Sequence, residues 1–273
     1  MKNRKNTGSR EPEKVRKPFM TGSPADENTV RTSLRFLGIL VLMIFVSFIT
    51  CSSVSAAGAI IRIPFNIAVI LLVLFIMFNN GSNHGSDAVA RGEIIYQKNQ
   101  DGKPYSESEK KICFHPLKGY ITGLLGTLPL FLVAVIFAFS TTIVLTGAGT
   151  LPSWMQAYTR RSDISDALVY YLQPEGMSLT DYLRIVIRIC ILPFVNLIGT
   201  QNPCSLLILE KLSPVILLLP AISYGTGYLY GPKNRTKVHT MISENSRRMK
   251  KKEMRARKKR SVRSSGSGPE QLN

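Results

Sequence analysis

The stretch GYITGLLGTLPLFLVAVIFAFSTTIVLT, residues 119–146, decides the fold class of this chain. It contains no charged residue, and it is longer than the about 20 apolar residues that a helix needs to cross a hydrocarbon core about 30 Å thick. Its apolar residues run continuously instead of alternating, which favours a membrane helix over a strand of a membrane barrel. The sequence therefore predicts a membrane-spanning helix over 119–146.

Three further apolar segments predict membrane spans over residues 34–57, 59–79 and 212–230. Charges are confined to the edges of these segments, where Arg35 and Arg62 can extend to the membrane surface. Prolines in the last segment can be tolerated where neighbouring helices pack against it. The predicted fold is therefore all-α, a polytopic integral membrane protein with four transmembrane helices.

The segment LRIVIRICILPFVNLIG, residues 183–199, leaves two interpretations. Arg184 and Arg188 each cost about 2.5–3.5 kcal/mol at the centre of a membrane helix, and the apolar residues offset that cost almost fully. A fifth span would carry the basic C-terminal region across the membrane. We therefore expect 183–199 to be an extracytoplasmic amphipathic or re-entrant helix, starting with a capping box of Ser178 and Asp181.

The distribution of Lys and Arg predicts which side of the membrane each loop occupies. The chain has 35 Lys and Arg against 17 Asp and Glu, and its net charge is +18. Nine bases lie in 1–35 and fourteen in 232–273, and positive residues next to spans favour the cytoplasm. We expect a multi-pass protein of the cell membrane with both termini cytoplasmic, and a disordered basic N-terminus over 1–33, a transmembrane domain over 34–230 and a basic tail over 231–273.

The stretch TCSSVSAAGAIIRIPF, residues 50–65, has two interpretations. Small residues at Ser55 and Ala57 suit cleavage by a signal peptidase, so residues 1–57 could be removed. The same small residues suit a tight turn between two membrane helices. The apolar run before them is longer than in most signal peptides, which favours the turn. The predicted topology is the same in both cases, and the intact mass would distinguish them.

Turn and glycine patterns give two further expectations. Strand-like residues flank Asp101-Gly102 within 93–105, which suggests a small β-hairpin in the polar linker. Glycines at helical spacing allow close helix packing, which we expect within one chain rather than between two copies. These glycines are Gly119, Gly123, Gly126, Gly227 and Gly231.

Arg184 and Arg188 are the first candidate functional site. With Asp181 they fall on one helical face, and ionisable groups at membrane depth often mark function. Two guanidinium groups on one face could bind a phosphate or a carboxylate. The alternative is that both extend to lipid headgroups, with Asp181 as their partner.

The run RRMKKKEMRARKKR, residues 247–260, is the second candidate site, and it holds ten bases and one acid. Each base near an anionic leaflet contributes about 1 kcal/mol of binding free energy, so the run could hold anionic headgroups or an acidic partner. Nucleic acid is an unlikely ligand because no aromatic residues accompany the run. An orientation signal with no ligand is the alternative. The ten bases are Arg247, Arg248, Lys250, Lys251, Lys252, Arg255, Arg257, Lys258, Lys259 and Arg260.

No motif for a reaction is visible. The four cysteines form no CxxC pair, although Cys190 and Cys204 could share the outer side, and the three histidines lie far apart. We expect no cofactor, no metal and no enzymatic activity. The favoured function is a non-enzymatic accessory or scaffold protein that binds the lipid bilayer, with another membrane protein as a candidate partner. The alternative is a small transporter or channel subunit in which Arg184 and Arg188 face an anion.

Overall fold

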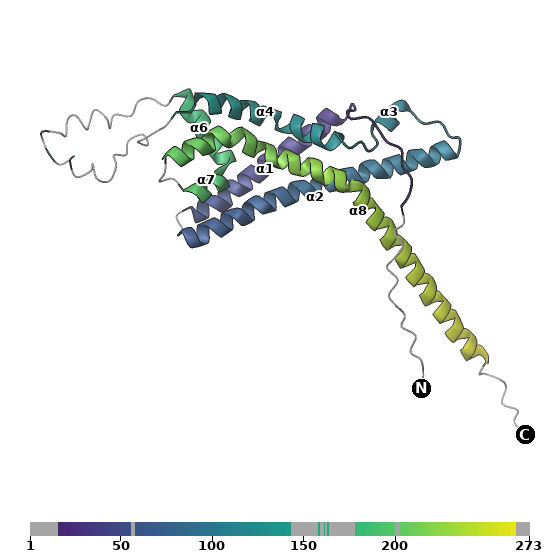
Figure 1. Ribbon diagram of the computed structural model, residues 1–273. Helices are drawn as coiled ribbons and strands as arrows, with labels where there is room; N and C mark the ends of the chain where they lie inside the picture. The colour runs from purple at the N-terminus through teal and green to yellow at the C-terminus, as the bar shows by residue number, and fades with distance from the viewer. Residues whose placement is uncertain are drawn as a thin grey trace, which may run out of the picture.

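All regular elements that a computed structural model describes are helices (Figure 1). The structure describes residues 16–55, 58–142, 158, 161, 163, 178–199 and 203–265, and these ranges contain no strand. In chain order the helices are α1 (Thr29–Val54), α2 (Ala59–Gln100), α3 (Glu107–Lys111), α4 (Lys118–Ser140), α6 (Leu179–Cys190), α7 (Leu192–Ile198) and α8 (Pro203–Ser265).

Four of these helices are long and apolar enough to cross a membrane, namely α1, α2, α4 and α8. The predicted all-α fold with four spans is confirmed. Helix α4 ends at Ser140 rather than at residue 146, and residues 143–146 of that predicted span lie outside the described residues. Most apolar side chains of the spans face outward, as expected for helices surrounded by lipid.

Helix α2 continues far beyond its predicted end at residue 79. At 1.5 Å per residue its 42 residues extend over about 63 Å, twice the thickness of a hydrocarbon core. The predicted β-hairpin over 93–105 is therefore wrong. Gly102 instead ends the helix with φ +68°, while the N–H groups of Gly102 and Lys103 donate back to the carbonyls of Asn99 and Lys98. This is a Schellman motif, so the Asp101-Gly102 pair stops a helix rather than joining two strands.

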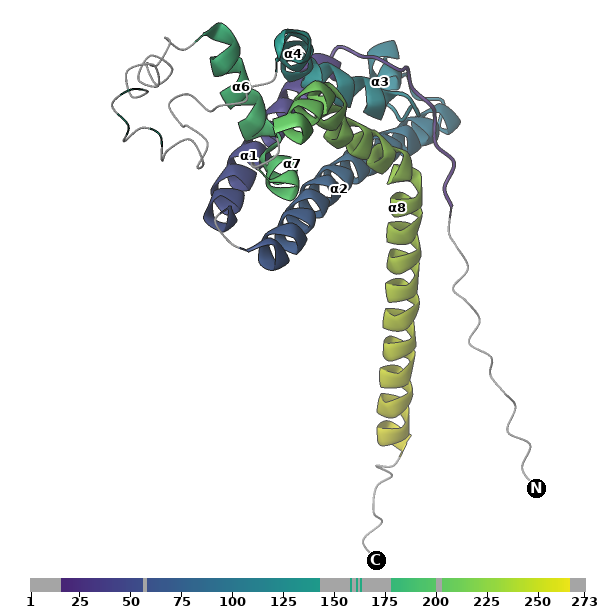
Figure 2. The same ribbon diagram turned by 60° about the vertical axis from the view of Figure 1, so that its left-hand side comes forward.

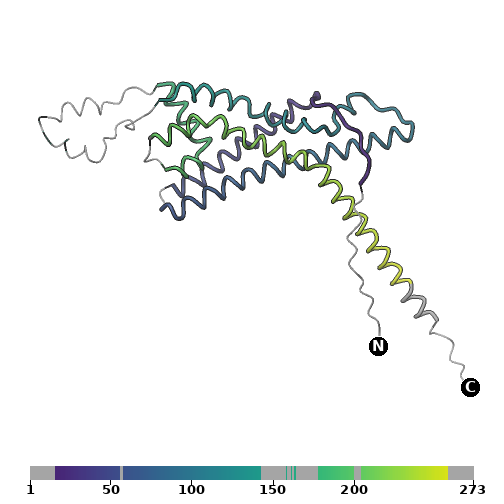
Figure 3. The backbone as a smooth tube through the Cα atoms, viewed as in Figure 1, coloured from purple at the N-terminus to yellow at the C-terminus, as the bar shows by residue number. Residues whose placement is uncertain are grey.

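Helix α8 carries both the last span and the basic run. Its 63 residues begin before the predicted span over 212–230 and continue through most of the predicted tail. Figures 1, 2 and 3 show its second half bending away from the bundle. Pro232 supplies a local cause, because proline cannot donate to the carbonyl four residues earlier. We call residues 240–265 the arm.

Backbone contact between α2 and α8 forms the most extensive interface of the bundle. Cβ atoms at Gly81 and Gly85 would collide with the backbone of α8, at Tyr224 and Tyr228 respectively. A Cβ at Gly227 would collide with the backbone of Phe78 in the same way. Small residues let membrane helices approach until their backbones touch, and here they do so on both partners.

The glycines of α4 and α8 also pack inside the chain, as expected from the sequence. A Cβ added at Gly123 would lie 2.9 Å from the carbonyl oxygen of Ala221 in α8. At Gly126 it would lie 2.7 Å from the carbonyl oxygen of Ser33 in α1. Helix α4 is therefore held between α1 and α8 by the small-residue face that its sequence displays.

Residues 183–199 form two short helices rather than one, because the chain breaks at Ile191 between α6 and α7. The capping box of Ser178 and Asp181 is confirmed, with the Ser178 N–H donating to Asp181 Oδ2 at 3.1 Å. Ile187, Ile191 and Val195 enter an apolar core with α4 and α8. Figure 2 shows α7 seated between α1 and α2. Whether α6 and α7 enter the bilayer stays a prediction.

The N-terminal residues 16–28 form a strap and residues 29–33 belong to α1, so the structure differs from the predicted disorder over residues 16–33, while the prediction for residues 1–15 stays a prediction. The strap lies across the bundle, where the Met20 N–H donates to the carbonyl of Gly92 and the Gly22 N–H to that of Phe114. Helix α1 then begins five residues before its predicted start. Residues 1–15, and Ala56 and Ala57 of the predicted cleavage site or turn, lie outside the described residues.

The bundle has two ends, which we call the arm end and the loop end. At the arm end, α1 and α4 begin, the strap crosses, and α2 and α8 continue past their apolar parts. At the loop end, α1 and α4 end, α2 and α8 begin, and α6 and α7 pack (Figure 1).

The backbone contact of Gly227 predicts a clear effect of one added methyl group. We expect Gly227→Ala to push α8 off α2 and to lower the free energy of unfolding by about 1–3 kcal/mol, as overpacking does. The thermal aggregation temperature of the detergent-solubilised protein measures this loss. Gly38→Ala is the matched control, because a Cβ at Gly38 meets no atom within 4 Å. Equal melting of both variants would contradict the proposed contact.

Candidate functional site

The predicted arginine pair lies at the loop end, where Glu210 of α8 binds both guanidinium groups. Arg184 and Arg188 are one turn apart on α6, so they project from the same face. Arg188 Nη2 lies 2.6 Å from Glu210 Oε1, Arg188 Nε donates to the same oxygen at 2.8 Å, and Arg184 Nε lies 3.3 Å from it. Glu210 is only 4% exposed, so this is a buried carboxylate with two cations.

Thr141, directly after α4, completes the cluster. Its hydroxyl donates to Glu210 Oε2 at 2.6 Å and accepts from Arg184 Nη2 at 3.1 Å. The same Nη2 also donates to the carbonyl of Thr142. The loop-end cluster thus ties α4, α6 and α8 together through one carboxylate, and every oxygen of that carboxylate has a partner.

The geometry gives the arginine pair an internal anion. Asp181, the partner expected from the sequence, contacts Arg184 at 3.4 Å but is more exposed than Glu210. Arg188 is 37% exposed, so only part of its guanidinium faces outward. Binding of an external anion by Arg184 and Arg188 stays a prediction. Glu210 was missed because it precedes the predicted span, although it is the acid nearest to that span's start.

Arg62 of α2 is a further cation at the loop end, and it has a different environment. Its Nε is buried without a hydrogen-bond partner. One turn deeper, Asn66 is fully buried and donates Nδ2 to the Arg62 carbonyl at 2.7 Å, while its Oδ1 has no partner. Buried polar atoms normally find partners, so this place on α2 is incomplete in the chain alone.

At the arm end, Glu93 of α2 holds α8 just before the arm leaves the bundle. Glu93 Oε2 accepts from Arg235 Nε and Nη2 at 3.2 and 3.1 Å. Its other oxygen lies 2.7 Å from His239 Nε2. Both Glu93 and His239 are buried. We call these three residues the arm clamp, because they fix the base of the arm against α2.

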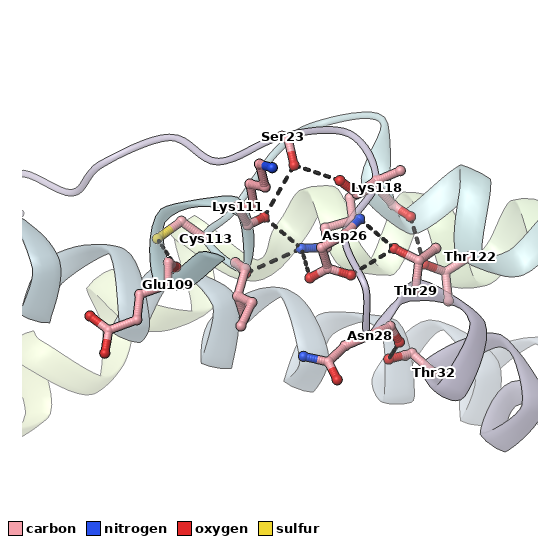
Figure 4. A network of polar contacts seen from close by, with 12 residues as sticks. Ser23, Asp26, Asn28, Thr29, Thr32, Glu109, Lys111, Cys113, Lys118 and Thr122 are labelled. Atoms are coloured by element: carbon pink, nitrogen blue, oxygen red, sulfur yellow. Dashed lines mark hydrogen bonds and ion pairs between the residues drawn. The ribbon is translucent and has the colours of Figure 1, made fainter. Parts of the chain in front are cut away.

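A second arm-end cluster docks the strap (Figure 4). Lys118, at the start of α4, donates to Asp26 Oδ2 at 2.7 Å and to the carbonyls of Lys111 and Ile112 at 3.1 and 3.2 Å. Asp26 also accepts from the Thr29 hydroxyl at 2.7 Å. Burial raises the pKa of Asp26, but the hydrogen bonds from Lys118 and Thr29 outweigh it and lower the pKa below the ordinary value of 3.8.

The basic run lies on the arm as a regular helix. Its bases from Arg247 to Arg257 are exposed, and the one ion pair among the described side chains of this run joins Arg248 to Glu244 at 4.0 Å. Exposed ion pairs of this kind contribute little to the stability of the fold. The side chains of Lys258, Lys259 and Arg260 lie outside the described residues, although the helix backbone includes them.

Metal-ligating side chains do not cluster in the described part of the chain. The described residues contain no group of three or more His, Cys, Asp and Glu side chains that could hold a metal ion. All four cysteines are free thiols, so Cys190 and Cys204 are not paired. The chemistry that the described part of the chain displays is charge binding, by buried carboxylates inside the bundle and by exposed bases on the arm.

Comparison with known proteins adds no family to this description. No protein-family model, no curated protein and no solved structure matches the chain.

The loop-end cluster predicts a strong effect of removing one charge. We expect Glu210→Gln to lower the free energy of unfolding by about 3–5 kcal/mol, because two arginines lose their shared buried carboxylate. Thermal denaturation in detergent measures the change. Glu244→Gln is the matched control, since Glu244 makes only the 4.0 Å pair with Arg248. A Glu210→Gln protein as stable as the control would show that the loop-end cluster does not stabilise the fold.

The Asp26 pKa predicts how docking of the strap depends on pH. A carboxyl group with a lowered folded pKa stabilises docking fully above its ordinary pKa and loses that contribution as pH falls through the folded pKa. We therefore expect the strap to stay docked from pH 8 down to about pH 4 and to detach only at lower pH. Hydrogen exchange of the Gly22 amide measures docking. Asp26→Asn should raise the exchange rate of the Gly22 amide at every pH between about 4 and 8. An unchanged exchange rate would contradict the role of Asp26.

Proposed function

We propose that this protein is a non-enzymatic membrane scaffold whose arm binds the anionic headgroups of the adjacent membrane surface. The observation that supports this most is the continuity of α8. One helix carries the last span, Arg235 and His239 of the arm clamp, and the exposed basic run. The position of the bases is therefore set by the membrane-embedded bundle and not by a loose linker.

The distribution of side chains around the arm suits a membrane surface. At about 100° per residue, the bases from Arg247 to Arg257 cover one broad side of the helix. Ile242, Met249 and Ala256 repeat at intervals of seven on the opposite side, and all three are exposed. A narrow apolar stripe beside a wide cationic face is typical of helices that lie at the headgroup level.

The direction of the arm supports the same proposal. Figures 1 and 2 both show the arm leaning away from the long axis of the bundle. An arm that leans sideways brings its bases over the lipid around the bundle. Each base near an anionic surface contributes about 1 kcal/mol, so three engaged bases would favour the bound arm roughly a hundredfold.

Sidedness is part of the proposal. Both tails carry the excess of Lys and Arg, which supports a cell-membrane protein with cytoplasmic termini. The arm would then meet the anionic cytoplasmic leaflet. A bound arm would also present the arm end, with its strap and clamp, to a membrane-protein partner. The alternative of an anion transporter has less support, because Glu210 already occupies Arg184 and Arg188.

Neutralising the arm tests the proposal. The reporter is a fluorophore on Ser261→Cys, with Cys204, the exposed native cysteine, replaced by Ser. The protein is placed in nanodiscs whose lipids carry a headgroup quencher. We expect strong quenching with phosphatidylglycerol and little with phosphatidylcholine. Changing the seven described bases to Gln should weaken the quenching with phosphatidylglycerol markedly, because most of the positive charge of the run is removed. The seven are Arg247, Arg248, Lys250, Lys251, Lys252, Arg255 and Arg257.

The matched control exchanges Arg for Lys and Lys for Arg at the same seven positions. Charge is then preserved, so quenching should persist and should fall with added salt as electrostatic binding does. Equal quenching in both lipids, or unchanged quenching in the Gln variant, would show that the arm does not bind headgroups by charge.

A further inference from the structure

An apolar cavity of about 60 Å³ lies at the loop end of the bundle. Helices α1 and α2 make few contacts with one another, and α7 packs against both of them. The cavity begins where α7 begins and continues between α1, α2 and α8. Its wall is almost wholly apolar and includes Leu40, Ile44, Ile70, Leu74, Pro193 and Phe194.

Arg62 stands nearer to the membrane surface than this cavity, on the same helix. Among the described residues no hydrogen bond or ion pair reaches its guanidinium group. The group lies against Gly199 at the end of α7, where a Cβ would be 3.3 Å from Arg62 Nη2. Gly199 has φ +85°, so its backbone also disfavours a side chain. The Arg62 guanidinium therefore packs closely against the backbone of Gly199 and lacks an anion among the described residues.

The spacing along α2 matches the shape of a phospholipid. At 1.5 Å per residue, Ile70 lies about 12 Å deeper than Arg62, and Leu74 about 18 Å deeper. A phosphate at the level of Arg62 would therefore place the middle of its acyl chain at the level of the cavity. A guanidinium group binds a phosphate through two parallel hydrogen bonds, which would give the buried Nε a partner.

We propose that one phospholipid from the leaflet at the loop end binds here, with its phosphodiester group on Arg62 and the middle part of one acyl chain entering the cavity between α1 and α2. The lipid completes the polar requirement of Arg62 and fills space that the side chains leave open. Helix α7 covers the chain from the loop-end side. This site is independent of the arm, which lies at the other end of the bundle.

Native mass spectrometry of the detergent-solubilised full chain tests the site. Phosphatidylglycerol, phosphatidylcholine and dioleoylglycerol are titrated separately, and the last one lacks a phosphate. We expect one tight phospholipid per chain, bound at least tenfold more strongly than dioleoylglycerol. Arg62→Gln should weaken both phospholipids about tenfold or more, because a charge-assisted hydrogen bond is lost. It should leave dioleoylglycerol unchanged.

Two further variants separate the site from general stability. Ser47→Leu fills the cavity from α1 and should weaken all three lipids while the protein stays folded, because Ser47 is buried in the cavity wall. Arg35→Gln removes an exposed charge at the arm end of α1 and should change nothing. The thermal aggregation temperature of each variant reports folding.

The proposal fails if the wild type binds no phospholipid more tightly than dioleoylglycerol. It also fails if folded Arg62→Gln or Ser47→Leu protein keeps wild-type affinity. The variant with seven bases of the arm changed to Gln should bind this lipid like the wild type, so a failure of the arm proposal and a failure of this site give different results.

Discussion

The close approach of α2 and α8 is the constraint on which the other contacts depend. Glycines on both helices let backbone meet backbone at several points of the contact. This approach brings Glu93 within reach of α8, where it can bind Arg235 and His239. It also orients the faces of α8 that receive α4 and the two short loop-end helices. A wider spacing between α2 and α8 would leave Glu93 as a buried carboxylate without cations, which is a costly state.

Three buried carboxylates then connect parts of the chain that lie far apart in the sequence. Asp26 joins the strap to α4, Glu93 joins α2 to α8, and Glu210 joins α8 to α6. The sequence indicated the cations of the loop-end cluster, because arginines in an apolar segment are conspicuous. It did not indicate the acids, since Asp26 and Glu93 lie in polar stretches where a charge is ordinary, and Glu210 precedes the predicted span. Only the folded arrangement of α2, α4, α6 and α8 makes them buried partners.

The four spans could be predicted because a chain in lipid must satisfy its backbone hydrogen bonds internally, which a helix does, and long apolar runs in the sequence identify such helices directly. The helical extensions outside the lipid could not be predicted in this way. Residues 80–100 contain several glycines, which weaken an isolated helix, so they suggest a linker. In the fold the same glycines admit α8 and the strap, and tertiary packing overrides the local preference. The basic tail likewise gave no helical pattern strong enough to extend the last span.

The unbroken α8 has a mechanical consequence. A helix transmits rotation about its own axis, so the angular setting of the basic face is fixed by how α8 sits between α2 and α4. One residue inserted between the clamp and the basic run would advance that face by about 100° and turn the cationic side away from its present direction. Four inserted residues would nearly restore it, displaced by about 6 Å. The glycines that seat α8 in the bundle therefore also set the direction in which the basic face of the arm points.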